Sequence, residues 1–393
     1  MAIASRITKR ALSTFAAAAK LPEAAVAAAG ADAVPAPSSA QQQQQVLEFE
    51  DTGRLFTGEP STALVRTLAA LQLMSAGPLV DVGLAALRSP AVAASPVVQA
   101  AARATAYKHF CAGETADEAA ARVQRLWRGG MGGILDYGIE DAEDGAACDR
   151  NVAGFLAAVD VAAKLPPGSA SVCIKITALC PIALLEKTSD LLRWQHKNPS
   201  VHLPWKQHAF PILSDSSPLY LTPSEPAALT AEEERELQLA HDRLLAVGAR
   251  CAEHGIPLLV DAEYASVQPS IDYFTFVGAL ACNGGGRPIV HGTVQAYLRD
   301  ARDRLEAMVR AAEEERVCLG VKIVRGAYLS LGLRNAGFQV SKYLPYGPVE
   351  HIIPYLIRRA EENRGLLSAS AFDRQLLRKE LVRRFKNAVM GRE

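Results

Sequence analysis

Residues 257–263 read PLLVDAE, a short apolar run that ends in two carboxylates. A helix is predicted just before it, starting at Thr230 and running to about His254. Thr230 and Glu233 form a capping box, in which each side chain satisfies the other residue's orphan backbone N–H. A long helix followed by a short apolar strand is the repeating unit of a parallel sheet, so this stretch places the chain in the α/β class.

Four further apolar runs have the length of strands. They read GILDYG at 133–138, SVCIKIT at 171–177, PIVH at 288–291 and LGVKIVR at 319–325. Between and after them, helices are predicted over 269–281, 294–316 and 349–364, whereas the proline- and serine-rich residues 190–226 predict a loop insertion. Five strands with intervening helices are compatible with a β/α barrel or an open doubly wound sheet.

Sequence motifs and strand ends favour the barrel. No G-x-G-x-x-G follows a predicted strand and no G-x-x-x-x-G-K-[ST] occurs, which weighs against Rossmann and P-loop folds. In a β/α barrel, polar residues at the carboxyl ends of the strands face the site. Tyr137, Lys175, Asp261 and Arg325 occupy such ends here.

Three of these polar residues could carry chemistry. Lys175 either reaches water at the barrel mouth or acts inside the site, as a Schiff-base lysine or a cation that orients the substrate. Asp261 is either a structural carboxylate or the partner that fixes a nearby cation. Arg325 precedes Gly326 and is either a surface arginine or a group that stabilises negative charge on a cofactor or substrate.

The predicted last helix contains two adjacent arginines, Arg358 and Arg359, in the stretch YLIRRAEEN. Arg358 and Glu362 are four residues apart, so they could form an exposed ion pair worth roughly 0.2–0.5 kcal/mol. Alternatively, the two guanidinium groups could bind a small carboxylate between Tyr343 and Tyr355, because the guanidinium fork matches a carboxylate bidentately.

Composition excludes several classes of protein. The 393 residues contain 42 Lys+Arg and 42 Asp+Glu, so no basic field favours nucleic acid. No uninterrupted run of about 18 apolar residues predicts a spanning helix, although a peripheral membrane contact is compatible with the sequence. Seven scattered cysteines without a CxxC pair favour free thiols in a reducing compartment over disulfides or a metal site.

The N-terminus is basic, rich in Ala and Ser, and free of acids before Glu23. This composition predicts an organellar transit peptide, with a disordered tail as the alternative. The expected organisation is therefore a transit peptide with a low-complexity segment at 1–50, a helical region at 51–130 and a barrel at 131–393.

Several motifs together resemble the proline dehydrogenase family, and they occur in the family's order over roughly residues 50–390. They are LDYGIE, CIKITAL, LLVDAE, TVQAYL, KIVRGAY and YLPYGPVEHIIPYLIRRAEENRG. The wording SKYLPYGPV resembles the plant branch, which implies the mitochondrion, in the matrix or associated with the inner membrane.

This resemblance implies a distorted (β/α)8, TIM-like barrel that holds FAD, with helices N-terminal to it. L-proline would pass a hydride from its C5 to N5 of FAD and become 1-pyrroline-5-carboxylate, the first step of proline catabolism to glutamate. Electrons would then pass to a quinone in the membrane. No nucleic acid and no metal are implied.

The resemblance also implies a role for nine residues. Arg358 and Arg359 match the pair that binds the proline carboxylate, with Lys175 nearby and Asp261 supporting the cluster. Tyr343 and Tyr355 match the walls of the proline pocket. The residues that match flavin contacts are Gln295, Arg325 and Glu362.

The chain departs from the family after KIVRGAY. The family continues there for roughly 80 to 100 residues, whereas here Tyr328 leads almost directly to SKYLPYGPV, with a join between Leu329 and Gly332. About two of the βα units that an eight-stranded barrel needs are therefore expected to be missing. One alternative is a catalytically impaired or dead splice or gene-model variant, and another is a Schiff-base aldolase using Lys175, which leaves the arginine pair unexplained.

Overall fold

The computed structural model describes residues 51–56, 59–75, 77–87, 89–211, 224–284, 286–296, 298–324, 340–365 and 367–390. The predicted transit peptide, Arg325 and the predicted join after Tyr328 lie outside these residues.

Six parallel strands form one sheet in the order β5-β4-β3-β2-β1-β6. Their bounds are β1 Gly132–Tyr137, β2 Ala170–Ile174, β3 Leu258–Val260, β4 Val290–Gln295, β5 Gly320–Val324 and β6 Ser341–Tyr346. Strands β1 to β5 follow one another in chain order, and β6 returns to pair with β1, with Gly132 opposite Ser341 and Tyr137 opposite Tyr346. A return to the first strand is the topology of a β/α barrel, whereas the strand order of a doubly wound sheet reverses at a switch point.

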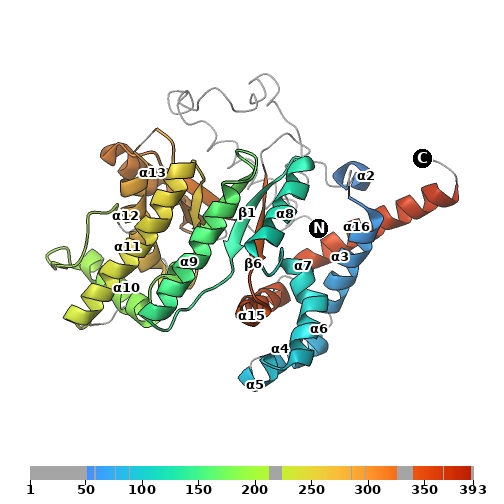
Figure 1. Ribbon diagram of the computed structural model, residues 1–393, viewed down its shortest axis with the longest axis horizontal. Helices are drawn as coiled ribbons and strands as arrows, with labels where there is room; N and C mark the ends of the chain where they lie inside the picture. Colours follow the sequence, from blue (N-terminus) through green and yellow to red (C-terminus); the bar gives the residue numbers. More distant parts are fainter. Residues whose placement is uncertain are drawn as a thin grey trace. The chain divides into compact units, whose positions relative to one another are not determined.

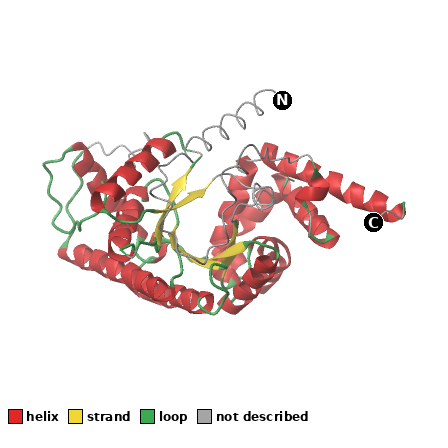
Figure 2. Ribbon diagram, turned by 90° about the horizontal axis from the view of Figure 1, so that it is seen from above, coloured by secondary structure: helices red, strands yellow, loops and turns green. Residues whose placement is uncertain are grey.

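The sheet is a curled half-barrel (Figure 2). Among the described strands, β5 and β6 form its two edges and do not pair with each other. The described residues form six strands where a closed (β/α)8 barrel has eight, so the predicted barrel lacking about two βα units is confirmed. All five strands expected from the sequence are present, but β6, which contains Pro345, was missed.

Helices cover the outer side of the sheet and precede it in the chain (Figure 1). The helices N-terminal to the sheet are α2 Thr52–Leu55, α3 Ser61–Met74, α4 Gly77–Leu87, α5 Pro90–Ala93, α6 Pro96–Ala102, α7 Lys108–Phe110 and α8 Ala116–Arg128, with a π-helical turn at Arg103–Tyr107. Those within and after the sheet are α9 Gly145–Ala162, α10 Ile182–Lys197, α11 Ala231–His254, α12 Gln268–Cys282, α13 Ala301–Glu315, α15 Val349–Gly365 and α16 Leu367–Val389.

The capping box at the start of α11 is confirmed. Glu233 N–H donates to Thr230 Oγ1 at 3.2 Å, and Thr230 N–H donates to Glu233 Oε2 at 2.7 Å. Gly255 ends the helix with φ 63°, a left-handed conformation that glycine adopts without strain. The chain then enters β3 directly.

Two of the expected boundaries were wrong. Residues 190–197 belong to α10, whose Leu191 and Leu192 are buried, so the expected loop over 190–226 starts too early. The helix expected from residue 294 begins at Ala301, because Val294 and Gln295 complete β4 instead. In both places the tertiary burial of apolar side chains outweighs the local pattern.

The main core lies between the sheet and its outer helices, where Leu135, Val172 and Leu258 from three strands are fully buried. A separate cluster joins α2 and α3 to the last helix, with Leu55 and Leu71 packing near Leu376. The chain's helical N-terminal region therefore contacts its C-terminal helix.

Candidate active site

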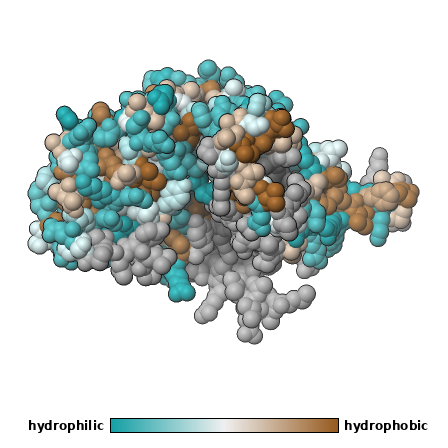
Figure 3. Space-filling model, turned by 90° about the horizontal axis from the view of Figure 1, so that it is seen from below, coloured by the Kyte–Doolittle hydropathy of each residue, from teal (hydrophilic) through white to brown (hydrophobic). Residues whose placement is uncertain are grey.

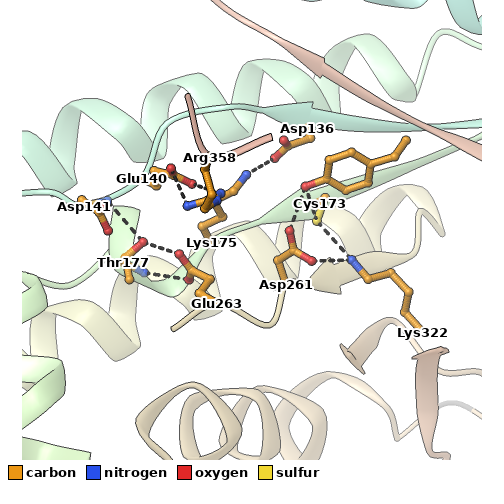
Figure 4. Close-up of polar contacts among 11 residues, drawn as sticks. Asp136, Glu140, Asp141, Cys173, Lys175, Thr177, Asp261, Glu263, Lys322 and Arg358 are labelled. Carbon is orange, nitrogen blue, oxygen red and sulfur yellow. Dashed lines mark hydrogen bonds and ion pairs between the residues drawn. The ribbon is translucent and has the colours of Figure 1, made fainter. Parts of the chain in front are cut away.

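Lys175 directly follows β2, and its side chain is only 1% exposed. Its Nζ donates to Asp136 Oδ1 on β1 at 2.7 Å, and Asp136 is completely buried (Figure 4). Burial opposes the charge on Lys175, but Asp136 and Asp261 outweigh it and raise the lysine pKa above its ordinary value. Of the two alternatives for Lys175, the one in which it reaches water at the barrel mouth is therefore wrong, since its ammonium group is buried beside Asp136.

Asp261 follows β3 and joins the two edges of the sheet through its side chain. Lys322 Nζ on β5 donates to Asp261 Oδ1 at 2.7 Å (Figure 4). Tyr343 OH on β6 donates to Asp261 Oδ2 at 2.8 Å. Burial opposes ionisation of Asp261, but Lys322 and Lys175 prevail and lower its pKa to about 2. Asp261 thus holds a cation and a phenol in fixed positions.

Arg358 on α15 reaches over the carboxyl ends of the strands. Its NH1 and NH2 each donate to Glu140 at 2.7 Å, a bidentate contact with the loop after β1 (Figure 4). Its guanidinium carbon also lies 5.8 Å from the ring centroid of Tyr264. Arg358 therefore already binds a carboxylate in the geometry that a small acid would use.

A second carboxyl network lies beside this ion pair. Thr177 Oγ1 donates to Glu263 Oε2 at 2.5 Å and accepts from Asp141 N–H at 3.2 Å. Tyr264 OH donates to Asp141 Oδ2 at 3.0 Å and connects the network to Arg358. Burial raises the pKa of Glu263 to about 8, so this carboxyl group holds a proton at neutral pH.

The remaining predicted residues fall around these clusters. Gln295 is the last residue of β4, next to β5 in the sheet. Tyr355 is buried in α15, with Ile352 in the same apolar cluster. Arg359 and Glu362 belong to α15, but their side chains are not described.

Three charged residues of the site were not predicted, namely Asp136, Glu140 and Lys322. Asp136 and Lys322 carried the same signal that singled out Lys175, a charge inside an apolar strand. Glu140 stands in the LDYGIE motif, but nothing local in the sequence indicates that it contacts Arg358.

A parallel half-barrel with cations and carboxylates at the carboxyl ends of its strands defines an enzyme of the β/α-barrel class. Residues 119–336 and 329–372 match the family model described as proline dehydrogenase. The chain belongs to the proline dehydrogenase family, whose members are flavin-dependent oxidoreductases that act on proline.

Relatives agree with this assignment. The chain is 41% identical over 431 residues to proline dehydrogenase 2, mitochondrial, of Arabidopsis thaliana, covering 86% of this chain and 90% of the relative. Identity is 39% to proline dehydrogenase 1, mitochondrial, of the same plant, with 88% of each chain covered. Bovine hydroxyproline dehydrogenase is 29% identical, over 86% of this chain and 94% of the relative.

These matches agree with a part of the barrel missing near the predicted join. Because 86% of 393 residues is about 338, the 431-residue alignment leaves about 93 positions without a residue of this chain. The two segments matched by the family model meet at 329–336, around the predicted join. In chain order this stretch lies between β5 and β6, which are the two edges of the sheet among the described strands.

The chemistry of the side chains on β4, β5 and β6 fits a flavin. A flavin ring takes hydrogen bonds and favourable charge along its edge. Gln295 supplies an amide, Lys322 a cation and Tyr343 a phenol, and all three lie on strands of the same sheet. The sheet therefore carries hydrogen-bonding groups of the kind that a flavin ring accepts.

Proposed function

We propose that this protein oxidises L-proline to 1-pyrroline-5-carboxylate in the mitochondrion, with FAD as hydride acceptor and a quinone as final electron acceptor. The observation that supports this most directly is the bidentate contact of Arg358 with Glu140, which presents a carboxylate-binding guanidinium above the strand ends. FAD, when bound, supplies the ring that accepts the hydride from C5 of proline.

The residues of the chain bind and orient the substrate. Arg358 exchanges Glu140 for the proline carboxylate, and Arg359 completes the clamp. Lys175, fixed by Asp136, adds positive potential without having to move. Asp261 keeps its two partners, Lys322 and Tyr343, in place.

Two groups of residues complete the proposed site. Tyr343 and Tyr355 form walls around the apolar proline ring. Gln295, Arg325 and Glu362 hold FAD.

Reduction of a quinone requires contact with the membrane. We propose that this contact is peripheral and is made with the inner membrane. In the described part of the chain, no helix has both the length and the apolar character to cross a bilayer. The basic residues before Glu23 and the mitochondrial names of the Arabidopsis relatives support this location.

Steady-state reduction of a soluble quinone analogue by the purified protein tests the proposal. In Arg358→Lys the bidentate fork is lost, so KM for proline should rise by about tenfold or more, with a smaller change in kcat. Arg302→Lys changes an exposed arginine on α13 and should leave both constants unaltered. An unchanged KM in Arg358→Lys would contradict the assigned role.

The open sheet favours a second candidate, a catalytically impaired variant of the family. Two unpaired edges expose backbone groups and leave a sector of the barrel without strands among the described residues. Visible absorbance of the purified protein separates the candidates: stoichiometric flavin that bleaches with proline supports the enzyme, and protein without flavin supports the impaired variant.

A further inference from the structure

The last helix, α16, carries apolar residues on two opposite faces. One face buries Leu376 and Leu377 against the cluster formed with α2 and α3. The other presents Val382, Phe385 and Val389, which are 52%, 70% and 70% exposed. Spacings of three and four residues place these three side chains in one stripe. A helix that packs through one face needs only one apolar stripe. Packing against α2 and α3 therefore does not account for the exposed stripe of Val382, Phe385 and Val389.

The exposed stripe is contiguous. Met390, which directly follows the last residue of the helix, is 56% exposed, so four large apolar side chains are exposed between residues 382 and 390. Figure 3 shows apolar residues gathered at the end of the molecule that these turns form. Single exposed apolar residues are ordinary, but a contiguous patch marks a surface that contacts a partner or a membrane.

Charge distinguishes between these occupants. The sequence of α16 contains six arginines and lysines and two acids, Asp373 and Glu380. Glu380 is buried and is already bound by Arg383 at 2.8 Å and Arg384 at 2.7 Å. The exposed surface of the helix is therefore cationic, so the same face of a second copy would repel it, whereas an anionic surface would attract it.

We infer that residues 379–390, which are the last turns of α16 and the residue after it, lie in the interface of an anionic lipid bilayer. Val382, Phe385 and Val389 enter the boundary of the acyl chains, while Lys379 and Lys386 lie among the headgroups. The inference rests on the proposed function in one respect, because a dehydrogenase that reduces a membrane-dissolved quinone must reach the bilayer surface. It does not depend on the state of the active site.

Cosedimentation with vesicles tests this surface. All variants are made in the full-length chain with Arg6, Lys9 and Arg10 changed to Gln, so that the basic N-terminus does not bind lipid on its own account. The vesicles contain phosphatidylcholine alone or phosphatidylcholine with cardiolipin. We expect binding to the cardiolipin vesicles only, weakened by added salt.

Two substitutions and two matched controls locate the contact. Phe385→Ser should weaken binding by at least about tenfold, since a buried phenylalanine contributes roughly 1.5–3 kcal/mol. Lys386→Gln should weaken it about fivefold, from about 1 kcal/mol for one charge near an anionic surface. Leu239→Ser and Lys164→Gln alter an exposed leucine of α11 and an exposed lysine after α9, and neither should affect binding.

The outcomes separate the surface from the proposed function. If the protein reduces a soluble acceptor with proline but does not bind vesicles, the inferred membrane contact is wrong and the proposed function stands. If the protein binds vesicles, loses this binding in Phe385→Ser and does not oxidise proline, the inferred membrane contact is supported and the proposed function is wrong. A concentration-dependent dimer lost in Phe385→Ser, with no vesicle binding, identifies a second copy as the occupant and overturns the inference.

Discussion

Lys175 and Asp136 form a buried ion pair that links β2 to β1 beneath the proposed substrate site. Lys175→Met should destabilise the protein by about 3–5 kcal/mol, because it leaves the carboxylate of Asp136 buried and uncompensated. The double variant Asp136→Leu/Lys175→Met should recover most of this loss, since both charges are then removed. Denaturant unfolding of the wild type, the single variants and the double variant measures each value.

The same variants separate stability from catalysis at Lys175. If Lys175 orients the proline carboxylate, the double variant should fold yet lose turnover, since packing restores the core but not the positive charge. Equal stability of Lys175→Met and the double variant would argue that Asp136 is not charged in the folded protein. Full turnover in the double variant would assign Lys175 a purely structural role.

Glu263 gives the protein a pH dependence with a defined sign. Its pKa is about 8 in the folded chain, above the ordinary value of 4.5, because the carboxyl group is buried. The folded state therefore binds the proton more tightly than the unfolded state does. The stabilisation is fully present below about pH 4.5 and is lost as the pH rises towards 8.

Glu263→Gln removes this titration while keeping an amide of the same shape next to Thr177. The wild type should lose stability relative to the variant as the pH rises from about 4.5 towards 8, by an amount on the order of 1 kcal/mol or more. Thermal melts across this range measure the difference, in which the titrations common to both proteins cancel. Glu314→Gln, at an exposed glutamate of α13, should parallel the wild type. Parallel profiles for the wild type and Glu263→Gln would contradict the raised pKa.

Helix α11 begins at a capping box that also anchors α10, because Glu233 accepts from Lys187 Nζ at 2.6 Å. Thr230→Ala should destabilise the protein by about 1 kcal/mol, since it leaves the Glu233 N–H without its acceptor. Thr230→Ser retains the oxygen and should stay within a few tenths of a kcal/mol of the wild type. Urea midpoints compare the three proteins, and equal losses in both variants would assign the effect to the lost methyl group instead of the cap.

Elements could be predicted from the sequence where local pattern and tertiary burial agree. The strand before Asp261 and the capped helix α11 are such cases. Strand β6 was missed because Lys342 and Pro345 interrupt its apolar pattern. Its proline is nevertheless compatible with the fold, because β6 pairs with β1 on one side only and a proline needs no donor on a free edge.

The ion pairs of the site show why a charged site residue is easier to predict from the sequence than the residue with which it pairs. A charge inside an apolar strand is visible in the sequence, as at Lys175, but its partner depends on which strands lie side by side. Asp261 was expected to fix a nearby cation, and the sheet assigns it Lys322 on β5. Lys175 is paired instead with Asp136 on the adjacent β1. The family resemblance named Arg358 but could not show that Glu140 holds it.

At the scale of the whole molecule, the order of the strands accounts for both the family and the departure from it. Strands β1 to β5 and β6 occupy the places of a barrel's first five strands and its last, which pairs with the first. Every ladder that the described strands form is parallel. The interruption is therefore confined to one sector, between β5 and β6, and the remaining sheet keeps the site's cations and carboxylates together through Asp261.

Restoring that sector should repair the barrel. We expect that inserting between Leu329 and Gly332 the corresponding segment of the Arabidopsis relative, roughly 80 to 100 residues by the family resemblance, will raise both flavin content and thermal stability. Two added strands would give the edges of β5 and β6 hydrogen-bonding partners and close the sector of the sheet beside the proposed flavin site. Each kcal/mol gained should raise the melting temperature by roughly 2–4 °C in a chain of this size.

A chain with a Gly/Ser insert of the same length is the matched control, because it lengthens the connection without supplying strands. Flavin absorbance per protein and the melting temperature should rise in the first chain only. If the unmodified protein already binds stoichiometric flavin and melts at the same temperature as the chain with the Arabidopsis segment, then six strands suffice for the flavin site. In that case the donors on β4, β5 and β6, which every one of these chains shares, would be the part of the barrel that binds the cofactor.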